Sequence, residues 1–183
     1  MSSYSSLLVD IGGTNMRYAY ANKKGISEEN ILSNISDQNI NKTLSNLLSN
    51  PKIKNAVIAA AGPRLGNRIE MTNRKVTIDA DLLCRKFELA NSQVLNDWEA
   101  VGYAIDEMKL KKIKKGKSKS NIDLMIGPGT GLGFAIVADG KVIPTEIGNT
   151  KLHSKLLLNN LGIRPSKYFS VLEDVISGPS ISR

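Results

Sequence analysis

Leu7-Leu8-Val9-Asp10-Ile11-Gly12-Gly13-Thr14-Asn15-Met16-Arg17 is the stretch on which the interpretation of this sequence rests. It begins as a short apolar run, typical of a buried strand, and then breaks at a Gly-Gly pair, which indicates a tight turn. Because glycine has no Cβ, a phosphate group can approach the backbone N–H groups of this turn closely. Asp10, at the end of the strand, could hold a magnesium ion directly or through water. Three side chains of the stretch can donate hydrogen bonds to phosphate oxygens: Thr14, Asn15 and Arg17.

A second glycine-rich loop, Gly127-Pro128-Gly129-Thr130-Gly131-Leu132-Gly133, also lies between two apolar runs. Two such strand–turn–strand units indicate two related half-domains that face one nucleotide. Neither loop matches the Gly-x-x-x-x-Gly-Lys-Ser/Thr pattern, and neither clearly opens a helix as a dinucleotide-binding turn does. A purely structural role for the glycines is the alternative, and the repetition of the pattern weakens it.

Composition excludes several classes of protein. The chain has 183 residues, of which 41% are hydrophobic, which suits one large domain or a small domain plus part of another. No apolar run reaches the length of a membrane span, and the first residues do not form a secretion signal. The single cysteine, Cys84, excludes an internal disulfide and a multi-cysteine zinc site. We therefore expect a cytoplasmic protein.

The net charge of +8 comes almost entirely from one segment. Seven lysines and no acidic residue lie between positions 109 and 119, and they account for all but one unit of that charge. The segment has no aromatic residue that could stack on bases. It is interpreted as a solvated loop, with a nonspecific phosphate-binding arm as the alternative, and we expect no specific nucleic-acid partner.

Periodicity predicts alternating strands and helices, which is an α/β pattern. Strands are expected at 5–10, 16–22, 29–35, 55–61, 66–71, 93–95, 122–126, 133–138 and 141–143. Helices are expected at 39–49, from an Asp79 or Asp81 cap through Phe87, from about Ala100 to Met108, at 151–161 and at 168–176.

Three acidic residues stand where chemistry could take place. Asp97 follows a short strand and precedes a helix, whose dipole would keep it ionised. It could accept the proton of a substrate hydroxyl that attacks phosphorus, or it could simply be the N-cap of the helix. Glu146 and Glu173 could each be a ligand or an ordinary surface acid.

Five segments occur in a fixed order: Asp10-Ile-Gly-Gly-Thr-Asn-Met-Arg17, Met71-Thr-Asn73, Leu95-Asn-Asp-Trp-Glu-Ala100, the loop 127–133, and Glu173 followed by Ser177-Gly-Pro179. In this order and rough spacing they resemble the bacterial glucokinases, in the hexokinase branch of the actin-like ATPase fold, which is ribonuclease H-like. The resemblance spans nearly the whole chain. It implies transfer of the γ-phosphate of ATP to the 6-hydroxyl of glucose, at the entry to glycolysis, with ATP and Mg2+ as cofactors.

The resemblance also implies a role for each matching residue. Asp97 would be the catalytic base, and the sugar ligands would be Asn73, Asn96, Asp97, Glu146, Asn149 and Glu173. The nucleotide phosphates would contact Gly12, Gly13, Thr14, Asn15, Arg17, Gly129, Thr130 and Gly131, with Asp10 serving the magnesium. The domains would be a small α/β domain at 1–108, a lysine-rich loop at 109–120, and the beginning of a large α/β domain at 121–183. A homodimer is compatible with the resemblance, and a membrane partner is not expected.

Two departures from the family pattern lead to further expectations. The family usually has Glu-Gly-Gly-His where this chain has Glu146-Ile147-Gly148-Asn149. A shorter amide at 149 predicts weaker sugar binding. The family also continues past position 183, so this length is expected to be a poor kinase that still binds glucose. Two alternatives stay open: a kinase for another hexose or an N-acetyl-hexosamine, and an inactive, truncated sugar-binding remnant.

Overall fold

Three neighbouring parallel strands in the first half of the chain decide where the turns that follow them lie. In the computed structural model these are β1 (Ser6–Ile11), β5 (Asn55–Ala60) and β9 (Asn91–Asn96). Strands β2 (Met16–Asn22), β3 (Gly25–Ile26) and β4 (Asn30–Leu32) extend the sheet on the β1 side, in the order β3-β2-β1-β5-β9 with β4 paired to β2. The register places Ile11 beside Ala60 and Ala60 beside Asn96, so the three strands end at one edge of the sheet.

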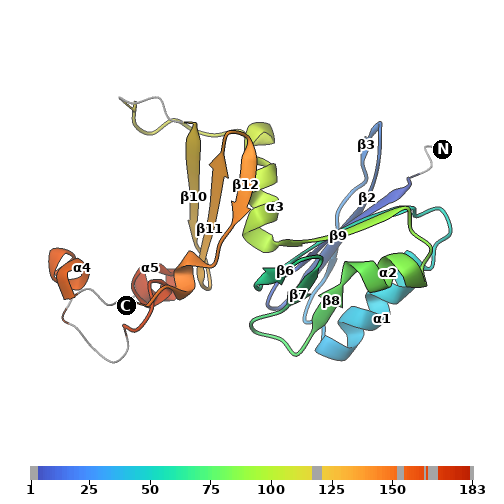
Figure 1. Ribbon diagram of the computed structural model, residues 1–183, viewed down its shortest axis with the longest axis horizontal. Helices are drawn as coiled ribbons and strands as arrows, with labels where there is room; N and C mark the ends of the chain where they lie inside the picture. Colours follow the sequence, from blue (N-terminus) through green and yellow to red (C-terminus); the bar gives the residue numbers. More distant parts are fainter. Residues whose placement is uncertain (1–3, 117–120, 152–154, 163, 165–168, 182–183) are drawn as a thin grey trace. The chain divides into compact units, whose positions relative to one another are not determined.

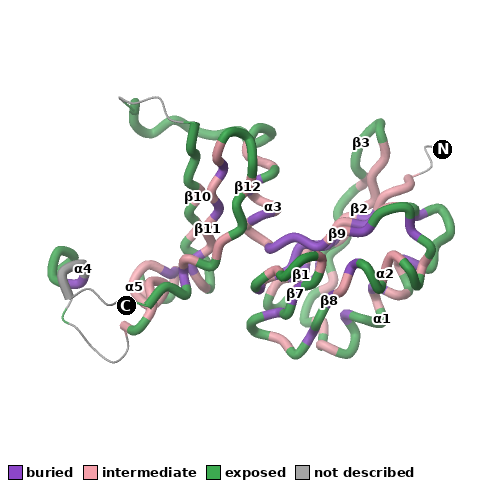
Figure 2. Tube along the Cα trace, viewed as in Figure 1, coloured by how far each residue is buried: buried purple, intermediate pink, exposed green. Residues whose placement is uncertain are grey.

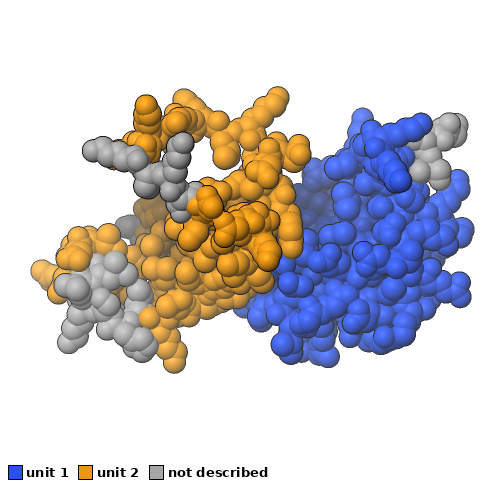
Figure 3. Space-filling view, turned by 45° about the horizontal axis from the view of Figure 1, so that its top comes forward, with its two compact units in different colours: residues 1–100 blue, residues 101–183 orange. Residues whose placement is uncertain are grey.

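The structure describes residues 4–116, 121–151, 155–162, 164 and 169–181. These divide into two compact units, residues 1–100 and 101–183, coloured blue and orange in Figure 3. No helix among the described residues has the length and apolarity needed to span a membrane.

The core of the first unit lies on one face of its sheet. Alternate residues of β1 are buried there, as expected for a strand whose two faces differ. Helix α1 (Asp37–Leu48) buries Ile40, Leu44 and Leu48 in this core, and the Ser36 side chain caps its first turn. Figure 2 shows the buried stretch of β9 as a continuous purple segment.

Helix α2 (Ala80–Lys86) confirms the predicted capping by Asp79, whose carboxylate accepts from the Leu82 N–H. The expected strand at 29–35 is shorter than predicted, because only Asn30–Leu32 pairs with β2. The expected helix from Ala100 to Met108 is also wrong in its bounds. It begins at Asp97 as α3 (Asp97–Tyr103), and a separate 3-10 turn, η1 (Ile105–Glu107), follows.

A small second sheet is attached to the first unit between β5 and β9. It consists of β6 (Arg64–Leu65), β7 (Arg68–Glu70) and β8 (Thr77–Asp79), paired in chain order. The chain enters it through Gly62, which has a φ of +155° and is buried. A Cβ at this position would lie 2.3 Å from the Glu70 carbonyl oxygen, so only glycine fits.

The second unit is built on an antiparallel meander of β10 (Ile122–Pro128), β11 (Leu132–Ala138) and β12 (Lys141–Pro144), seen in Figure 1. Asp139 and Gly140 both have positive φ values, which confirms the predicted Asp-Gly hairpin turn. Short helical segments follow: η2 (Ile147–Asn149), α4 (Lys155–Asn160), α5 (Glu173–Ile176) and α6 (Gly178–Ile181).

Two predicted helices of the second unit are shorter in the structure. Of the expected 151–161 helix, Lys155–Asn160 forms α4, whereas Lys151 forms a bridge with Val171. The 168–176 helix begins at Glu173, because the Asp174 carboxylate accepts from the backbone N–H groups of Ser170 and Val171 and holds them outside the helix. Positions 152–154 and 168 lie outside the described residues. The lysines from 109 to 115 are exposed and belong to no helix or strand, whereas positions 117 and 119 are outside the described part.

The Gly62 contact generates a stability prediction. Gly62→Ala should lower the free energy of unfolding by at least about 2 kcal/mol, because the new methyl group clashes with backbone and the backbone angle becomes strained. Gly13→Ala is the matched control, since a Cβ there meets nothing within 4 Å; it should change stability by less than about 0.5 kcal/mol. Urea unfolding measures both values, and equal stability of the two variants would contradict the close packing at Gly62.

Candidate functional site

The carboxyl ends of β1, β5 and β9 bring together three turns at one edge of the first unit's sheet. Ligands of open α/β sheets bind at such edges, outside the carboxyl ends of the parallel strands. The turns are residues 12–15 after β1, residues 61–62 after β5, and Asn96-Asp97 at the end of β9. The predicted residues Asp10, Asn96 and Asp97 therefore lie along one edge.

The first glycine turn is closed by a hydrogen bond from the Gly12 N–H to the Asn15 carbonyl oxygen, 2.9 Å long. Gly13 and Thr14 are exposed at its tip. The Arg17 guanidinium lies 3.2 Å from an Asp10 carboxylate oxygen and 3.3 Å from a Glu29 oxygen. The structure thus places one predicted phosphate donor, Arg17, against the predicted metal ligand, Asp10, and pairs Arg17 with Glu29 as well.

Asn96 is the N-cap of α3, which corrects the alternative that Asp97 caps the helix. The Asn96 side-chain oxygen accepts from the N–H groups of Trp98 and Glu99, at 2.9 and 3.2 Å. In return the Glu99 carboxylate accepts from the Asn96 N–H at 3.1 Å, which completes a capping box. The Asn96 side-chain amide also donates to the Gly62 carbonyl oxygen. Asn96 therefore ties the end of β9 to the turn after β5.

Glu99 and Arg64 form a supporting ion pair that the sequence reasoning missed. Glu99 is 1% exposed, and the Arg64 guanidinium lies 2.9 Å from its carboxylate. A buried carboxylate needs such a partner, because removing its charge from water costs several kcal/mol. The signal was present in the sequence as Asn96-x-x-Glu99, which is a capping-box spacing.

Asp97 is partly buried beside this capping box. Burial raises the pKa of its carboxyl, the Trp98 N–H that bonds to its carboxylate lowers it, and the negative charge of Asp10 raises it further. The net pKa is above the ordinary value of an aspartate. Desolvation is the largest of these influences on the Asp97 pKa, and the expectation based on the helix dipole did not include it.

Asn73 is exposed in the turn between β7 and β8. The Met71 N–H donates to the Val76 carbonyl oxygen and closes this turn. The Thr72 N–H donates to the Ala61 carbonyl oxygen and fastens the turn to the end of β5. Asn73 is therefore carried by a segment that is bonded to the same sheet edge as Asp97.

The remaining predicted residues form a second group, within the second unit. The loop 127–133 joins β10 to β11, and its Leu132 N–H donates to the Glu173 carboxylate at 3.3 Å. A Cβ on Gly131 would lie 2.7 Å from that carboxylate, so a larger residue at this position would displace the Glu173 side chain. The Gly178 N–H, at the start of α6, donates to the Gly129 carbonyl oxygen. The second glycine loop, Thr130 included, is thus held against the start of α5 and α6.

Glu146 precedes the 3-10 turn η2, and Asn149 is its last residue. The Asn149 side-chain amide donates to the Glu146 carboxylate at 3.2 Å, so the two predicted sugar ligands contact each other. Gly148 between them is buried, and a Cβ there would lie 2.8 Å from the Leu132 carbonyl oxygen. The turn that carries both residues therefore packs closely on the second glycine loop.

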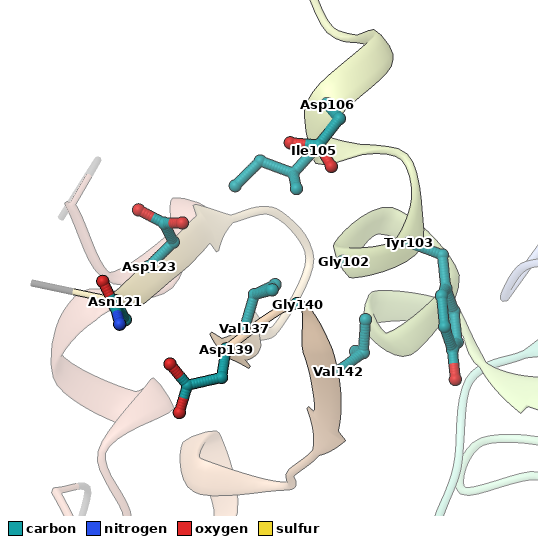
Figure 4. A pocket seen from close by; sticks show the side chains of 10 residues that line it. All are labelled: Gly102, Tyr103, Ile105, Asp106, Asn121, Asp123, Val137, Asp139, Gly140 and Val142. Carbon is teal, nitrogen blue, oxygen red and sulfur yellow. The ribbon is translucent and has the colours of Figure 1, made fainter.

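A cavity of about 560 Å3 lies elsewhere in the second unit and contains none of the predicted residues. Figure 4 shows the side chains of Asp106, Asp123 and Asp139 around it. Within the described part of the chain, no group of three acidic, histidine or cysteine side chains is arranged to hold a metal ion. A metal at Asp10 would need oxygen ligands from a bound molecule, which is common for magnesium at phosphates.

Comparison with known proteins identifies the family. The family model described as Glucokinase matches residues 7–181, nearly the whole chain. The chain belongs to the glucokinase family. A glucokinase of Campylobacter jejuni subsp. doylei is 35% identical over 146 residues, which cover 73% of this chain and 42% of that protein. A glucokinase of Mesorhizobium japonicum is 33% identical, with 70% and 40% covered. The chain thus spans about two fifths of the length of these relatives.

Solved glucokinase structures confirm the predicted α/β fold of the actin-like ATPases. A glucokinase from an Antarctic psychrotroph superposes with a TM-score of 0.68 at 29% identity, covering 96% of this chain and 61% of the other. A glucokinase from Balamuthia mandrillaris in complex with glucose has a TM-score of 0.67 at 19% identity, with 98% and 60% covered, and shows the shared fold.

Because the pKa of Asp97 is raised, we expect the replacement of Asp97 by asparagine to stabilise the fold in a pH-dependent way. A carboxyl whose pKa is higher in the folded state destabilises the fold when ionised. The cost is present above the folded pKa and disappears as pH falls below the unfolded value. Asp97→Asn should therefore raise the Tm by about 1 to 4 °C at pH 7 and by less at pH 3. The exposed Glu28→Gln is the control and should leave the Tm unchanged. A lower Tm for Asp97→Asn at pH 7 would contradict the assigned desolvation.

Proposed function

We propose that the protein is a glucokinase, which transfers the γ-phosphate of ATP to the 6-hydroxyl of glucose. The observation that carries this proposal is the placement of Asp97 at the edge formed by β1, β5 and β9. There its carboxylate is partly buried and lies within the electrostatic influence of Asp10, next to the first glycine turn. Family membership supplies the reaction class, and this edge supplies a suitable base.

Asp97 acts in this proposal as the general base. Its carboxylate accepts the proton of the 6-hydroxyl while the hydroxyl oxygen forms a bond to the γ-phosphorus. The bond from that phosphorus to the β–γ bridging oxygen breaks, and ADP leaves with the bonding electrons. A raised pKa makes the carboxylate a stronger base than an ordinary aspartate, which favours proton transfer near neutral pH.

The capping residues give this base a fixed position. Asn96 bonds to two N–H groups of α3 and to the Gly62 carbonyl, so the peptide that carries Asp97 cannot rotate without breaking these bonds. The Arg64–Glu99 pair holds the other half of the capping box. Preorganisation of this kind lowers the cost of aligning base and hydroxyl in the transition state. In addition to Asp97, the proposed sugar ligands are Asn73, Asn96, Glu146, Asn149 and Glu173.

The two glycine turns would bind the phosphates of ATP, through Gly12 to Asn15 with Arg17 and through Gly129 to Gly131. Asp10 fits a magnesium ion, because its side chain is 44% exposed and offers the hard oxygen ligand that this ion prefers. Magnesium, when bound, would neutralise charge on the phosphates. Arg17, which already pairs with Asp10, would then orient this carboxylate.

The substrate and setting follow from the same proposal. We place the protein in the cytoplasm, where ATP and glucose are available, without a specific nucleic-acid partner and with a homodimer as an assembly to be tested. One alternative is a kinase for another hexose or an N-acetyl-hexosamine. The Asn149–Glu146 contact favours it, because an amide held by Glu146 can select a different sugar substituent than a histidine would. An inactive sugar-binding protein is the alternative from a different class.

A kinetic experiment tests the proposal. Residues 1–183 are joined to the remaining C-terminal residues of the Saccharophagus degradans glucokinase, which is 30% identical and matches all of this chain over 63% of its own length. The fusion should phosphorylate glucose in a coupled assay. Asp97→Asn should lower kcat by roughly 10² or more with little change in the KM for glucose, because only the transition state needs the base.

The control for this experiment is Glu28→Gln, which removes an exposed carboxylate of the same unit and should keep normal kcat. Folding of each variant is checked by circular dichroism. Assays with glucose, mannose, N-acetylglucosamine and N-acetylmannosamine test the alternative substrates. Near-normal kcat in folded Asp97→Asn would refute the assignment of the base, and a folded fusion without activity on any of the sugars would refute the kinase.

A further inference from the structure

Arg74 is a buried arginine that neither the sequence motifs nor the comparisons assign to any role. Its side chain is 7% exposed, which is unusual for arginine. It lies next to Asn73 in the turn between β7 and β8 and belongs to the first unit. Burying a guanidinium costs free energy unless its N–H groups have acceptors. The acceptors of the two terminal nitrogens of Arg74 show which segments this side chain holds together.

The guanidinium joins three segments that are distant in sequence. One terminal nitrogen donates to the Gly13 carbonyl oxygen at 2.6 Å, which is a short bond. The other donates to the Ile35 carbonyl oxygen at 2.8 Å and to the Asp37 carboxylate at 3.1 Å. The Lys75 N–H donates to the second oxygen of the Asp37 carboxylate, so the Arg74 turn is doubly attached to the start of α1.

The bond to Gly13 controls the direction of the first glycine turn. In a trans peptide the C=O of one residue and the N–H of the next point in opposite directions. Holding the Gly13 carbonyl toward Arg74 therefore holds the Thr14 N–H away from it. The Thr14 carbonyl accepts from the Ile35 N–H at 3.3 Å, which turns the Asn15 N–H away from Ile35 in the same manner. The Thr14 and Asn15 N–H groups are thus left free of these two carbonyl contacts, and successive N–H groups of a turn can bind an anion.

We propose that Arg74 is a positioning residue for phosphate binding: it fixes the Gly13–Thr14 peptide so that the Thr14 N–H donates to a phosphate oxygen of the nucleotide. This inference rests on the proposed function, because that function makes the first glycine turn a phosphate site. Arg74 itself does not touch the phosphate, since its terminal nitrogens are engaged with Gly13, Ile35 and Asp37.

The planar fork of arginine is needed for this task. Two terminal nitrogens reach the Gly13 and Ile35 carbonyl oxygens at the same time, whereas the single ammonium group of lysine cannot reproduce that geometry. A lysine at this position would keep the positive charge and lose the alignment. This difference separates positioning from a simple electrostatic attraction for phosphate.

The test is a titration of the 183-residue chain with magnesium tripolyphosphate, followed through the backbone amide NMR signals of Gly13, Thr14 and Asn15. In the unaltered chain these signals should shift on titration. In Arg74→Met the dissociation constant reported by them should rise at least fivefold, and Arg74→Lys should not restore it. Amide signals of β5 and β9 should keep their positions in both variants, which a general loss of structure would not allow.

Arg68→Met is the matched control. Arg68 is an exposed arginine of the same unit, and its guanidinium pairs with Glu70 in the described part of the chain. It removes an equal charge and should leave tripolyphosphate binding within twofold. Equal binding by Arg74→Met and the unaltered chain would overturn this inference alone, as would full rescue by Arg74→Lys. Absence of any shift at the turn in the unaltered chain would overturn the phosphate site, and with it both proposals.

Discussion

The in-register parallel pairing of β1, β5 and β9 is the constraint on which the site in the first unit depends. Because Ile11, Ala60 and Asn96 are neighbours across the sheet, the three segments that follow them begin at the same edge. A shift of the register by one residue would move the buried side chains of β1 to the other face of the sheet. Burial of Leu7, Val9 and Ile11 therefore fixes the positions of Asp10 and of the glycine turn.

Hydrogen bonds between these turns give the shared edge a defined geometry. The Asn96 amide bonds to the Gly62 carbonyl, the Thr72 N–H to the Ala61 carbonyl, and the Arg74 guanidinium to the Gly13 carbonyl. Each bond links a turn at the end of one strand to a neighbouring segment. The buried Arg64–Glu99 pair supports the same edge, and its value lies in the geometry it fixes, because buried ion pairs contribute little net stability.

Local pattern was sufficient to predict much of this structure. Short apolar runs predicted β1 and β5, the Asp-Gly pair predicted the hairpin at 139–140, and the motif order predicted the family. The glycine turns could be recognised because their glycines lie close together in the sequence. The roles of the individual site residues stay predictions.

Tertiary contacts decided what the sequence could not. Whether Asn96 or Asp97 caps α3 depends on which side chain reaches the Trp98 and Glu99 N–H groups, and spacing alone allows both. The sign of the pKa shift of Asp97 depends on its burial, which the helix-dipole argument ignores. Arg74 was invisible because its acceptors, Gly13 and Ile35, are far away in the sequence. The late start of α5 was hidden for a related reason, since the Asp174 side chain competes with the helix for two N–H groups.

The central claim is that the carboxyl edge of β1, β5 and β9 binds the sugar. The most direct measurement is a backbone amide NMR map of the 183-residue chain titrated with glucose. If this edge binds the sugar, the shifts should be saturable and centred on Asn73, Asn96 and Asp97. Shifts centred instead on Asp123 and Asp139, around the cavity of the second unit, with those three amides unmoved, would contradict it.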